Sequence, residues 1–367
     1  MTVRVIHIFT SLDFGGVETH ALTVARNAHC SNNEIYFCAL GSGGAVSNEL
    51  EKLGFPVYCL NCSGKIPDIE VIYNLLGLLA RIKPGVVHCH GSEANFHGLI
   101  SAWLCRVPVR IGEEIGIPRH SRLAKLVFKM VYVFSHRVIG ISDAVRDWLV
   151  NSSEVPARKA VKIYNPVELI FTERLSSERR EYDVFKVGYV GRLEEVKNPL
   201  ALIRSVALLK EKNVPVKLFV VGDGSQMESC IALCSDLSLI DEVELVGYSN
   251  NPRSYVSQCD IYVQPSLSEG FGIALVEAMG CGVPVLATKV GGAPEIIDHG
   301  KTGWLVDYSD PVSLCDSLYQ IWNQRENLTE IGECAKESVR GRFEPENYMV
   351  ELDNLYSGLA KSGSGNG

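Results

Sequence analysis

The chain has 367 residues, a net charge of −8 and 46% hydrophobic residues. A chain of this length usually forms two or three domains, each large enough to bury its own core. The negative charge argues against nucleic acid as the main partner, because binding phosphates over a large surface requires an excess of basic residues. The apolar stretches are much shorter than the roughly 18 residues of a membrane-spanning helix, and no leader-like segment is evident. We therefore expect a cytoplasmic protein.

Twelve cysteines are dispersed singly along the chain. Cys59 and Cys62 form the only C-x-x-C pair, and no histidine lies near it at zinc spacing. Unpaired cysteines are typical of a reducing compartment. The sequence thus predicts neither a structural metal nor a redox function.

The first half alternates β-branched apolar runs with helical patterns, which is typical of βαβ units and a parallel sheet. A helix over Val17–Ala28 directly follows Gly15-Gly16, and this order places a pyrophosphate at a helix N-terminus. The predicted strands are Val3–Phe9, Glu34–Leu40, Val57–Leu60, Val86–His88, Val109–Gly112, Arg137–Ile141 and Val161–Tyr164.

Residues 172–183 (TERLSSERREYD) are charged and lack an apolar face, so we predict a linker there and a boundary near Phe185. After this segment, the alternation of apolar runs and helical patterns begins again. The predicted domains are 1–184 and 185–345, both Rossmann-like, followed by a final helix and a disordered tail in 346–367. The strands predicted in the second half are Lys186–Val190, Lys217–Val221, Val243–Val246, Ile261–Gln264, Val285–Ala287 and Trp304–Val306.

The segment Ser268–Ile297 carries the strongest functional pattern. Glu269 and Glu277 flank a Gly-Phe-Gly turn, and the run Phe271–Met279 predicts a helix. The N–H groups of a helix's first turn form a ready site for phosphate. One carboxylate lies before the helix and the other one to two turns inside it, so each can meet a hydroxyl on one side of a bound phosphate. This pattern predicts a nucleotide-sugar pocket.

This segment resembles the retaining family 4 glycosyltransferases of the GT-B fold. Further motifs match in the family's order: GGVETHAL (Gly15–Leu22), VVHCHG (Val86–Gly91), VGRLEEVKNP (Val190–Pro199), VGDG (Val221–Gly224) and GGAPEII (Gly291–Ile297). The resemblance implies an α/β protein with two Rossmann-like domains whose parallel sheets face across a cleft. It also implies that the last helix, with Pro345–Leu359 as the candidate, crosses back to the first domain.

The resemblance also assigns roles to individual residues. Arg192 and Lys197 correspond to the family's diphosphate clamp, and two cations at the carboxyl edge of a sheet would neutralise a leaving diphosphate. Without the family, the same two residues would be an exposed basic pair at a helix start. Glu269 is expected to bind a hydroxyl of the transferred sugar. The implied nucleotide-sugar-binding residues are Gly15, Gly16, Gly191, Gly270, Phe271, Gly272, Ile273 and Glu277.

His90 follows the strand Val86–His88, and the resemblance places it in the donor-sugar pocket near the reacting centre. A single histidine at a strand end is more often structural. The expected catalytic residues are therefore Arg192, Lys197, Glu269 and His90. No Asp-x-Asp motif, which would hold Mn²⁺ or Mg²⁺ through hard oxygen ligands, occurs in the sequence. We expect no cofactor and no metal, with the nucleotide-sugar as a substrate.

A helical pattern over residues 121–137 carries a basic stripe formed by Arg122, Lys125, Lys129 and His136. Beside apolar residues, such a stripe would contact anionic lipid and place the protein peripherally on the inner face of a membrane. The simpler alternative is a solvated helix edge. Arg119, just before the helix, is expected to bind an acceptor phosphate.

The leading hypothesis is a retaining hexosyltransferase that moves a sugar from a nucleotide-sugar to a hydroxyl acceptor, such as a lipid-linked saccharide in surface polysaccharide biosynthesis. UDP is favoured over GDP because it is the commonest donor nucleotide. The alternatives are a nucleotide-sugar 2-epimerase of the same fold and an inactive nucleotide-sugar-binding protein. An NAD-dependent oxidoreductase is disfavoured because Gly15-Gly16 does not form G-x-G-x-x-G. The sugar, the base, the acceptor and the oligomeric state stay open.

Overall fold

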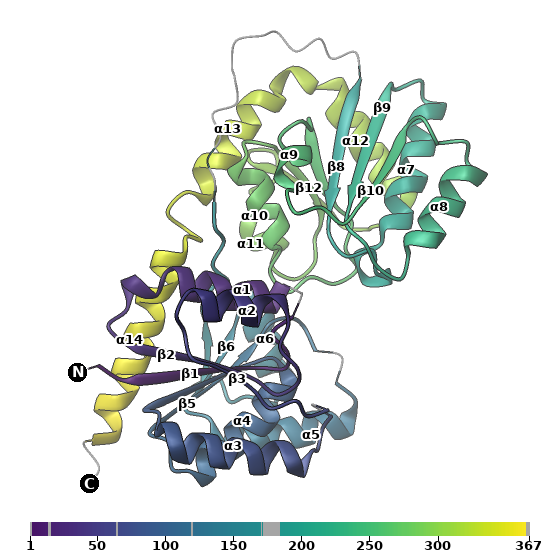
Figure 1. Ribbon diagram of the computed structural model, residues 1–367. Coiled ribbons are helices and arrows are strands. Elements are labelled where there is room, and N and C mark those ends of the chain that lie inside the picture. Colours follow the sequence, from purple (N-terminus) through teal and green to yellow (C-terminus); the bar gives the residue numbers. More distant parts are fainter. Residues whose placement is uncertain are drawn as a thin grey trace. The chain divides into compact units, whose positions relative to one another are not determined.

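The computed structural model describes residues 2–13, 16–63, 65–118, 120–169, 171 and 184–364 (Figure 1). The chain forms two compact units. One comprises Met1–Pro166 together with Phe343–Gly367, and the other Val167–Arg342. The predicted linker, 172–183, lies outside the described residues, so the domain boundary near Phe185 stays a prediction.

The first unit is built on a parallel sheet with strand order β3-β2-β1-β4-β5-β6-β7. Every strand predicted from the apolar runs of the first half is confirmed, with ends shifted by up to two residues. One of the two-residue shifts is in β4, which continues to His90 and so includes the residue expected just beyond it. The strands are β1 Arg4–Phe9, β2 Glu34–Ala39, β3 Val57–Cys59, β4 Val86–His90, β5 Val109–Glu114, β6 Arg137–Gly140 and β7 Ala160–Lys162.

Helices cover both faces of this sheet (Figure 1). On one face, α1 (Gly16–Arg26), α2 (Ala45–Lys52) and α14 (Pro345–Ser364) pack into a common apolar cluster with β1 and β2. On the other lie α3 (Ile69–Ile82) and α4 (Ser92–Leu104). Because α14 follows the second unit in sequence yet contacts α1 and β5, the expected return of the last helix to the first domain is confirmed.

The helix predicted over residues 121–137 is shorter than expected. The structure has α5 over Arg122–Val131, a 3₁₀ turn η2 over Tyr132–Phe134, and then β6, which is followed by α6 (Asp143–Asn151). Lys159 explains where the helix ends. Its Nζ donates to the main-chain carbonyls of Tyr132, Val133 and Ser135 at 3.0, 2.8 and 2.6 Å. These bonds satisfy carbonyls that a continuing helix would otherwise use.

The second unit repeats the α/β pattern with strand order β10-β9-β8-β11-β12-β13, all parallel. Its strands also confirm the prediction. They are β8 Phe185–Val190, β9 Val216–Val221, β10 Val243–Gly247, β11 Ile261–Gln264, β12 Val285–Thr288 and β13 Gly303–Val306. The helices are η3 Glu195–Lys197, α7 Pro199–Glu211, α8 Met227–Asp236, α9 Arg253–Val256, α10 Ile273–Gly280, α11 Ala293–Ile296, α12 Pro311–Asn323, η4 Arg325–Asn327 and α13 Leu328–Val339.

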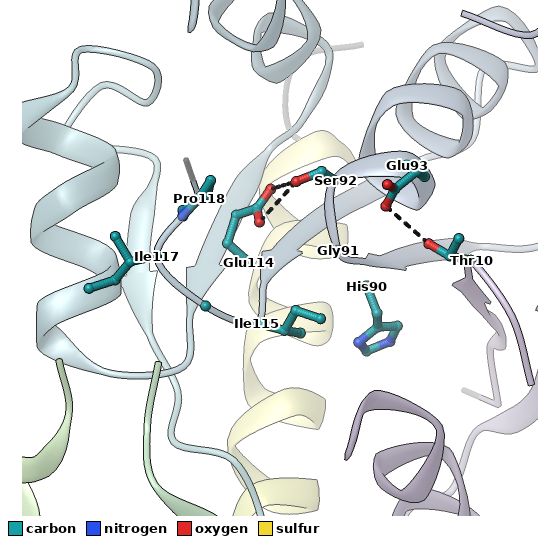
Figure 2. Close-up of a pocket in the computed structure, with 10 residues that line it drawn as sticks. Thr10, His90, Gly91, Ser92, Glu93, Glu114, Ile115, Ile117 and Pro118 are labelled. Carbon is teal, nitrogen blue, oxygen red and sulfur yellow. Dashed lines mark hydrogen bonds between the residues drawn. The ribbon is translucent and has the colours of Figure 1, made fainter. Parts of the chain in front are cut away.

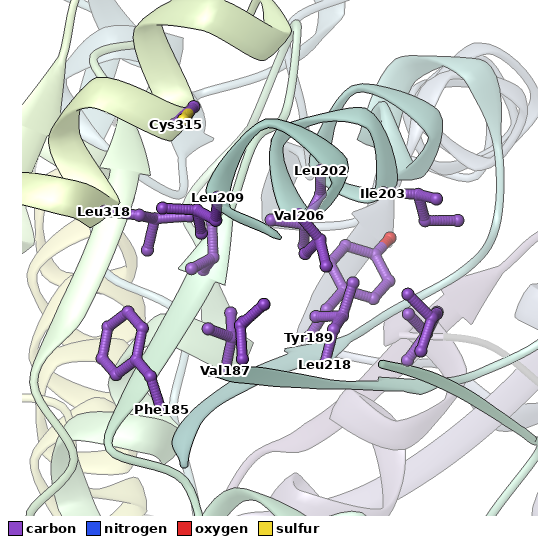
Figure 3. Packing of buried hydrophobic residues seen from close by; sticks show 14 of the residues in the cluster. Phe185, Val187, Tyr189, Leu202, Ile203, Val206, Leu209, Leu218, Cys315 and Leu318 are labelled. Atoms are coloured by element: carbon purple, nitrogen blue, oxygen red, sulfur yellow. The ribbon is translucent and has the colours of Figure 1, made fainter. Parts of the chain in front are cut away.

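A buried apolar cluster holds α7 and α12 against β8 and β9 (Figure 3). Val206 and Leu209 of α7 meet Leu318 of α12 above Val187 and Leu218 on the strands. In both sheets the strand order reverses beside the first strand, at β1/β4 and at β8/β11. Open α/β sheets bind ligands beyond the carboxyl ends of the strands at such a switch point. The loops that follow these four strands are therefore the places where a ligand is expected to bind.

Candidate functional site

In the second unit, the loops after β8 and β11 bring two predicted catalytic residues into contact. Lys197 Nζ donates to Glu269 Oε2 at 2.7 Å, although the residues are 72 positions apart. Both side chains are largely buried, with 23% and 12% exposed. The main-chain N–H of Leu267 also donates to the carbonyl of Val196 at 2.8 Å, which ties the two loops together. The sequence pattern gave no direct sign of this pairing.

Further donors surround the Glu269 carboxylate. The Gln264 side-chain amide and, at 3.4 Å, the Ser266 hydroxyl reach the same Oε2 atom as Lys197. Gln264 ends β11, and the Tyr262 hydroxyl on the same strand donates to the carbonyl of Val190 at 3.0 Å. The orientation of Glu269 is therefore fixed by a rigid strand end rather than by its loop alone.

Glycines allow two loops to lie against the site. A Cβ built on Gly291 would be 1.6 Å from the main-chain oxygen of Glu269, and Gly291 has a φ of 54°. Likewise, a Cβ on Gly222, whose φ is 137°, would be 1.9 Å from the carbonyl oxygen of Gly191. Real side chains cannot approach a main-chain oxygen so closely. The GGAPEII and VGDG motifs thus have a steric role in packing the strand-end loops.

The helix predicted from Phe271 begins two residues later. Gly272, with a φ of 111°, is the N-cap of α10, and Ile273 is its first residue. The Phe271 side chain is buried, so it would meet a nucleotide only through its main chain. Glu277 lies just over one turn inside α10, as predicted. Gly270 precedes the helix on the loop that carries Glu269.

Glu277 has a partner that the sequence interpretation did not identify. Arg253 of α9 places Nη2 3.2 Å from Glu277 Oε1 and also donates to the main-chain carbonyl of Glu168. Burial raises the pKa of Glu277, while Arg253 acts in the opposite direction. Arg253 ends the segment VGYSNNPR (Val246–Arg253), whose composition gives no sign of a contact with a carboxylate on another helix.

The structure describes only some of the other predicted site residues. Arg192 lies exposed on the loop after β8, five residues before Lys197. Gly16 is the first residue of α1, whereas Gly15 and Arg119 lie outside the described residues. The roles predicted for these residues, and for the nucleotide-binding glycines, stay predictions.

The first unit contains a pocket of about 260 Å³ at the carboxyl ends of β1, β4 and β5 (Figure 2). This edge is the switch point of the sheet, where ligands bind in related architectures. Its wall is partly acidic. Its lining residues are Thr10, His90, Gly91, Ser92, Glu93, Glu114, Ile115, Gly116, Ile117 and Pro118.

The two carboxylates of this pocket differ in their surroundings. Glu93 accepts a hydrogen bond from the Thr10 hydroxyl at 3.3 Å. Glu114 is buried and accepts from Tyr132, Asn95 and Ser92, the first two both at Oε1. Burial raises the pKa of Glu114 to about 7 despite these donors. Carboxylates with such neighbours can hold the hydroxyls of a polar ligand. The sequence interpretation missed both, although Glu114 ends β5 and Glu93 lies in the first turn of α4, three residues after β4.

His90 lines the pocket, but its ring is 1% exposed and stacks on Phe9 with 4.3 Å between centroids. Its Nε2 is 2.9 Å from Nδ1 of His7, and its Nδ1 is 3.3 Å from Glu113 Oε1. Burial and the nearby His88 lower the pKa of His90 to about 3. Both ring nitrogens thus have protein partners here, and the predicted contact of His90 with a donor sugar stays a prediction.

A second pocket, of about 660 Å³, lies at the amino ends of β8, β9 and β10, the opposite edge from Lys197 and Glu269. Lysine and acidic side chains around it largely satisfy each other; Lys210 Nζ, for example, is 2.6 Å from Glu242 Oε1. We assign no function to this pocket.

The outer face of α5 and η2 combines exposed apolar and basic residues. Leu123, Leu126, Met130 and Val133 are 57–72% exposed. His136, predicted on the same stripe, lies beyond η2 and accepts from the main-chain N–H of Arg110 at 3.1 Å. Among the described helices, none is long and apolar enough to cross a membrane. The basic residues that remain on the helix are Arg122, Lys125 and Lys129.

Comparison with protein families gives two adjacent matches. Residues 14–171 match the family described as Glycosyltransferase Family 4, and residues 172–338 match Glycosyl transferases group 1. Together the two matches span most of both units.

Similar proteins carry transferase and biosynthesis names. A capsular polysaccharide biosynthesis glycosyltransferase of Staphylococcus aureus is 24% identical over 316 residues, 81% of this chain and 83% of its own. The UDP-Gal:alpha-D-GlcNAc-diphosphoundecaprenol alpha-1,3-galactosyltransferase of Escherichia coli is 27% identical over 321 residues, 82% of each chain. An N-acetyl-alpha-D-glucosaminyl L-malate synthase of Bacillus anthracis is 29% identical, but the match covers only 59% of each chain.

Among solved structures, Anabaena Alr3699/HepE in complex with UDP and glucose has a TM-score of 0.83 at 21% identity. The match covers 97% of this chain and 100% of that one. TarM, at 14% identity, has a TM-score of 0.80 and similar coverage, 97% and 99%. At these identities the likeness establishes the fold.

Proposed function

Because the chain belongs to the family 4 glycosyltransferases of the GT-B fold, we propose that it is a retaining glycosyltransferase with a UDP-sugar donor and a hydroxyl acceptor. The observation that carries this proposal is the 2.7 Å contact between Lys197 and Glu269 at the β8/β11 switch point. It joins a cation suited to a diphosphate with a carboxylate suited to a sugar hydroxyl. Alr3699/HepE binds UDP in the same fold, which supports the choice of nucleotide.

The proposed chemistry divides the work among four side chains. Arg192 and Lys197 neutralise the charge that develops on the leaving diphosphate, the kind of preorganised contact that contributes most to catalysis. Glu277, oriented by Arg253, accepts hydrogen bonds from the ribose. The bond between the anomeric carbon and the diphosphate oxygen breaks, and the acceptor oxygen bonds to the same face of that carbon. The acceptor proton passes to the diphosphate oxygen, so no enzymic nucleophile is required.

For the acceptor, we propose a lipid-linked saccharide. The Escherichia coli relative is named for an acceptor on diphosphoundecaprenol, and the Staphylococcus aureus relative for capsular polysaccharide. In this chain, the pocket residues Ile117 and Pro118 lie four and three residues before Ser121, the N-cap of α5. A polar pocket therefore adjoins an exposed apolar and basic helix, as a saccharide with a lipid tail requires. Glu93 and Glu114 would receive hydroxyls of the saccharide.

Donor binding can be tested first without an acceptor. A ligand at about 100 times its dissociation constant adds about 2.7 kcal/mol to stability, so UDP should raise the Tm clearly and GDP and ADP should not. Labelled UDP-sugars should then be hydrolysed slowly to UDP and free sugar, with EDTA present. Conversion to an epimeric nucleotide-sugar would establish the epimerase alternative, and binding without turnover the inactive one. Loss of activity in EDTA, restored by Mn²⁺ or Mg²⁺, would contradict metal independence.

Membrane contact is tested with vesicles containing anionic lipid. Each basic residue near such a surface contributes about 1 kcal/mol, weakened by salt. Replacing Arg122, Lys125 and Lys129 by Ser should therefore release the protein at low salt. The control variant, with Ser at the exposed Lys52, Lys212 and Lys301, removes the same charge elsewhere and should stay bound. If the unmodified protein does not bind at low salt, α5 is a solvated helix edge.

A further inference from the structure

A buried polar cluster lies on one face of the first sheet. His7 of β1, His88 and His90 of β4, and Glu113 of β5 are each at most 1% exposed. Strand pairing explains why they meet. His7 pairs with His88 and His90 pairs with Glu113, and alternate residues of a strand point to the same face. No motif of the donor site includes His7, Glu113 or the helix that covers them.

Hydrogen bonds connect this cluster to α14. The Tyr356 hydroxyl of α14 is 2.7 Å from His88 Nδ1, and His88 Nε2 is 3.0 Å from Glu113 Oε2. The other carboxylate oxygen of Glu113 faces His90 Nδ1 at 3.3 Å, and His90 Nε2 faces His7. A continuous chain therefore runs from α14 through Tyr356, His88, Glu113 and His90 to His7.

One arrangement of hydrogens suits the three hydrogen-bonded links of this chain, whereas His88 Nε2 and Glu113 Oε2 approach to 3.0 Å without hydrogen-bond geometry. If Glu113 is a carboxylate, it accepts from His90 Nδ1–H, and its other oxygen attracts the nearby His88 Nε2–H electrostatically. Neutral His90 then accepts at Nε2 from His7 Nδ1–H, and neutral His88 accepts at Nδ1 from the Tyr356 hydroxyl. The pKa directions of three members agree with this arrangement. Burial lowers the pKa of His7 and of His90, and the pKa of Glu113 is lowered by the neighbouring histidines against the effect of its burial.

The same histidines could in principle hold a metal ion. Two nitrogen ligands of a tetrahedral zinc, each about 2.05 Å from the metal, are about 3.3 Å apart. The His7 Nδ1 to His90 Nε2 distance is 2.9 Å, the usual length of a hydrogen bond. For the His7–His90 pair, the geometry therefore favours a hydrogen bond over shared metal ligation.

We propose that Tyr356, His88 and Glu113 are positioning residues that hold His90 as the neutral Nδ1–H tautomer and thereby fix the rim of the first-unit pocket. Main-chain geometry links them to that rim. Gly91, which follows His90, has a φ of 86°, and its N–H donates to the Glu113 carbonyl at 2.9 Å. The Asn95 side chain also holds the main chain of Glu113. Its Oδ1 accepts from the Glu113 N–H at 3.1 Å, and its Nδ2 donates to the Glu113 carbonyl at 2.9 Å. Docking of α14 would thus shape a pocket lined by Gly91, Ser92 and Glu93.

Two further titratable groups face the cluster. His20 of α1 is 2.9 Å from the Tyr348 hydroxyl of α14, and its ring centroid is 5.3 Å from that of His90. Burial lowers the pKa of His20. Its neutral form adds no positive charge beside His90, so His20 is compatible with the proposed tautomer.

The tautomer is measured by ¹⁵N NMR of the full chain labelled at histidine, with His7→Gln and His90→Gln for assignment. His90 should be neutral with its proton on Nδ1, unchanged from pH 6 to 8. In Glu113→Gln, one carboxylate oxygen becomes an NH₂ donor, so His88 or His90 must change tautomer. A protonated His90 at pH 7, a proton on Nε2, or unchanged tautomers in Glu113→Gln would overturn the proposal.

The link to α14 is tested by kinetics. The proposal rests on the proposed transfer reaction. Tyr356→Phe should lower kcat for transfer about tenfold while leaving the KM for donor and the affinity for UDP unchanged, since displaced groups slow catalysis without touching the nucleotide. Ser357→Ala removes a hydroxyl from the next position of α14, where Ser357 bonds only within the helix at 3.3 Å, and should keep wild-type kcat. Equal kcat in both variants refutes the link. If the wild type shows no transfer at all, the proposed function is refuted instead. The NMR experiment then remains the test of the His90 tautomer.

Discussion

Replacing Lys197 by Met separates its structural and catalytic contributions. The substitution keeps the length of the apolar stem and removes the charge that lies 2.7 Å from Glu269 Oε2. Exposed ion pairs contribute 0.2–1 kcal/mol, and breaking a fully buried one costs about 3–5 kcal/mol. Because Lys197 is 23% exposed and Glu269 keeps Gln264 and Ser266 as donors, we expect a loss of about 1–2 kcal/mol in the free energy of unfolding. We expect kcat to fall much further, by about 10²–10³.

The assay combines urea unfolding with transfer at saturating donor. Lys210→Met is the matched control, because it breaks a 2.6 Å ion pair with Glu242 that lies away from the strand-end loops. It should lower stability slightly and leave kcat unchanged. Combining Lys197→Met with Glu269→Gln measures the coupling between the two side chains, which should appear in kcat as well as in stability. Near-wild-type turnover of Lys197→Met would refute the diphosphate-clamp role.

Three further predictions follow from contacts in the same structure. Glu277→Ala and Arg253→Ala should both weaken UDP binding in calorimetry, whereas Glu269→Ala should leave it nearly unchanged; equal losses in all three would contradict the division of roles. Gly291→Ala should abolish transfer with the first unit still folded, because its Cβ would collide with the main-chain oxygen of Glu269. Burial raises the pKa of Glu114 to about 7, so the folded state keeps a proton that the unfolded state loses above about pH 4.5. The wild type should therefore lose up to about 3 kcal/mol in the free energy of unfolding as the pH rises from about 4.5 to 7. Urea titrations at pH 5 and pH 8 should show this loss in the wild type and not in Glu114→Gln.

The fold was largely predictable because its signals are local. Each buried parallel strand is a short apolar run, and each turn into a helix carries glycine or a capping residue, so thirteen strands were located from pattern alone. Two of the boundaries that differ from the prediction have tertiary causes. The helix beginning at Arg122 ends at Val131 because Lys159, almost 30 residues later, takes the following carbonyls. Phe271 precedes α10 because its side chain is drawn into the core.

The donor site was predictable in residue identity but not in pairing. Spacing indicated that Glu269 and Glu277 flank a phosphate-binding turn, and the sheet topology brings Lys197 to the first and Arg253 to the second. No local pattern specifies a contact between residues 72 positions apart, since it depends on which strands are neighbours. The family resemblance supplied the expected roles of Lys197 and Glu269, which periodicity could not, but not the contact between them.

In the first unit, the VVHCHG motif also has structural contacts that the sequence did not indicate. VVHCHG was interpreted as a strand followed by a ligand-binding histidine, yet β4 includes His90 and buries its ring against Phe9. Four imidazoles, one carboxylate and two tyrosines gathered in one buried cluster are costly unless most polar atoms have partners, and their mutual contacts restrict how the groups can be arranged. Sequence alone cannot reveal such a network, because Tyr356 lies 268 residues from His88. The VVHCHG motif therefore has a structural role that requires no ligand, because His88 binds α14 to the sheet whose edge forms the pocket.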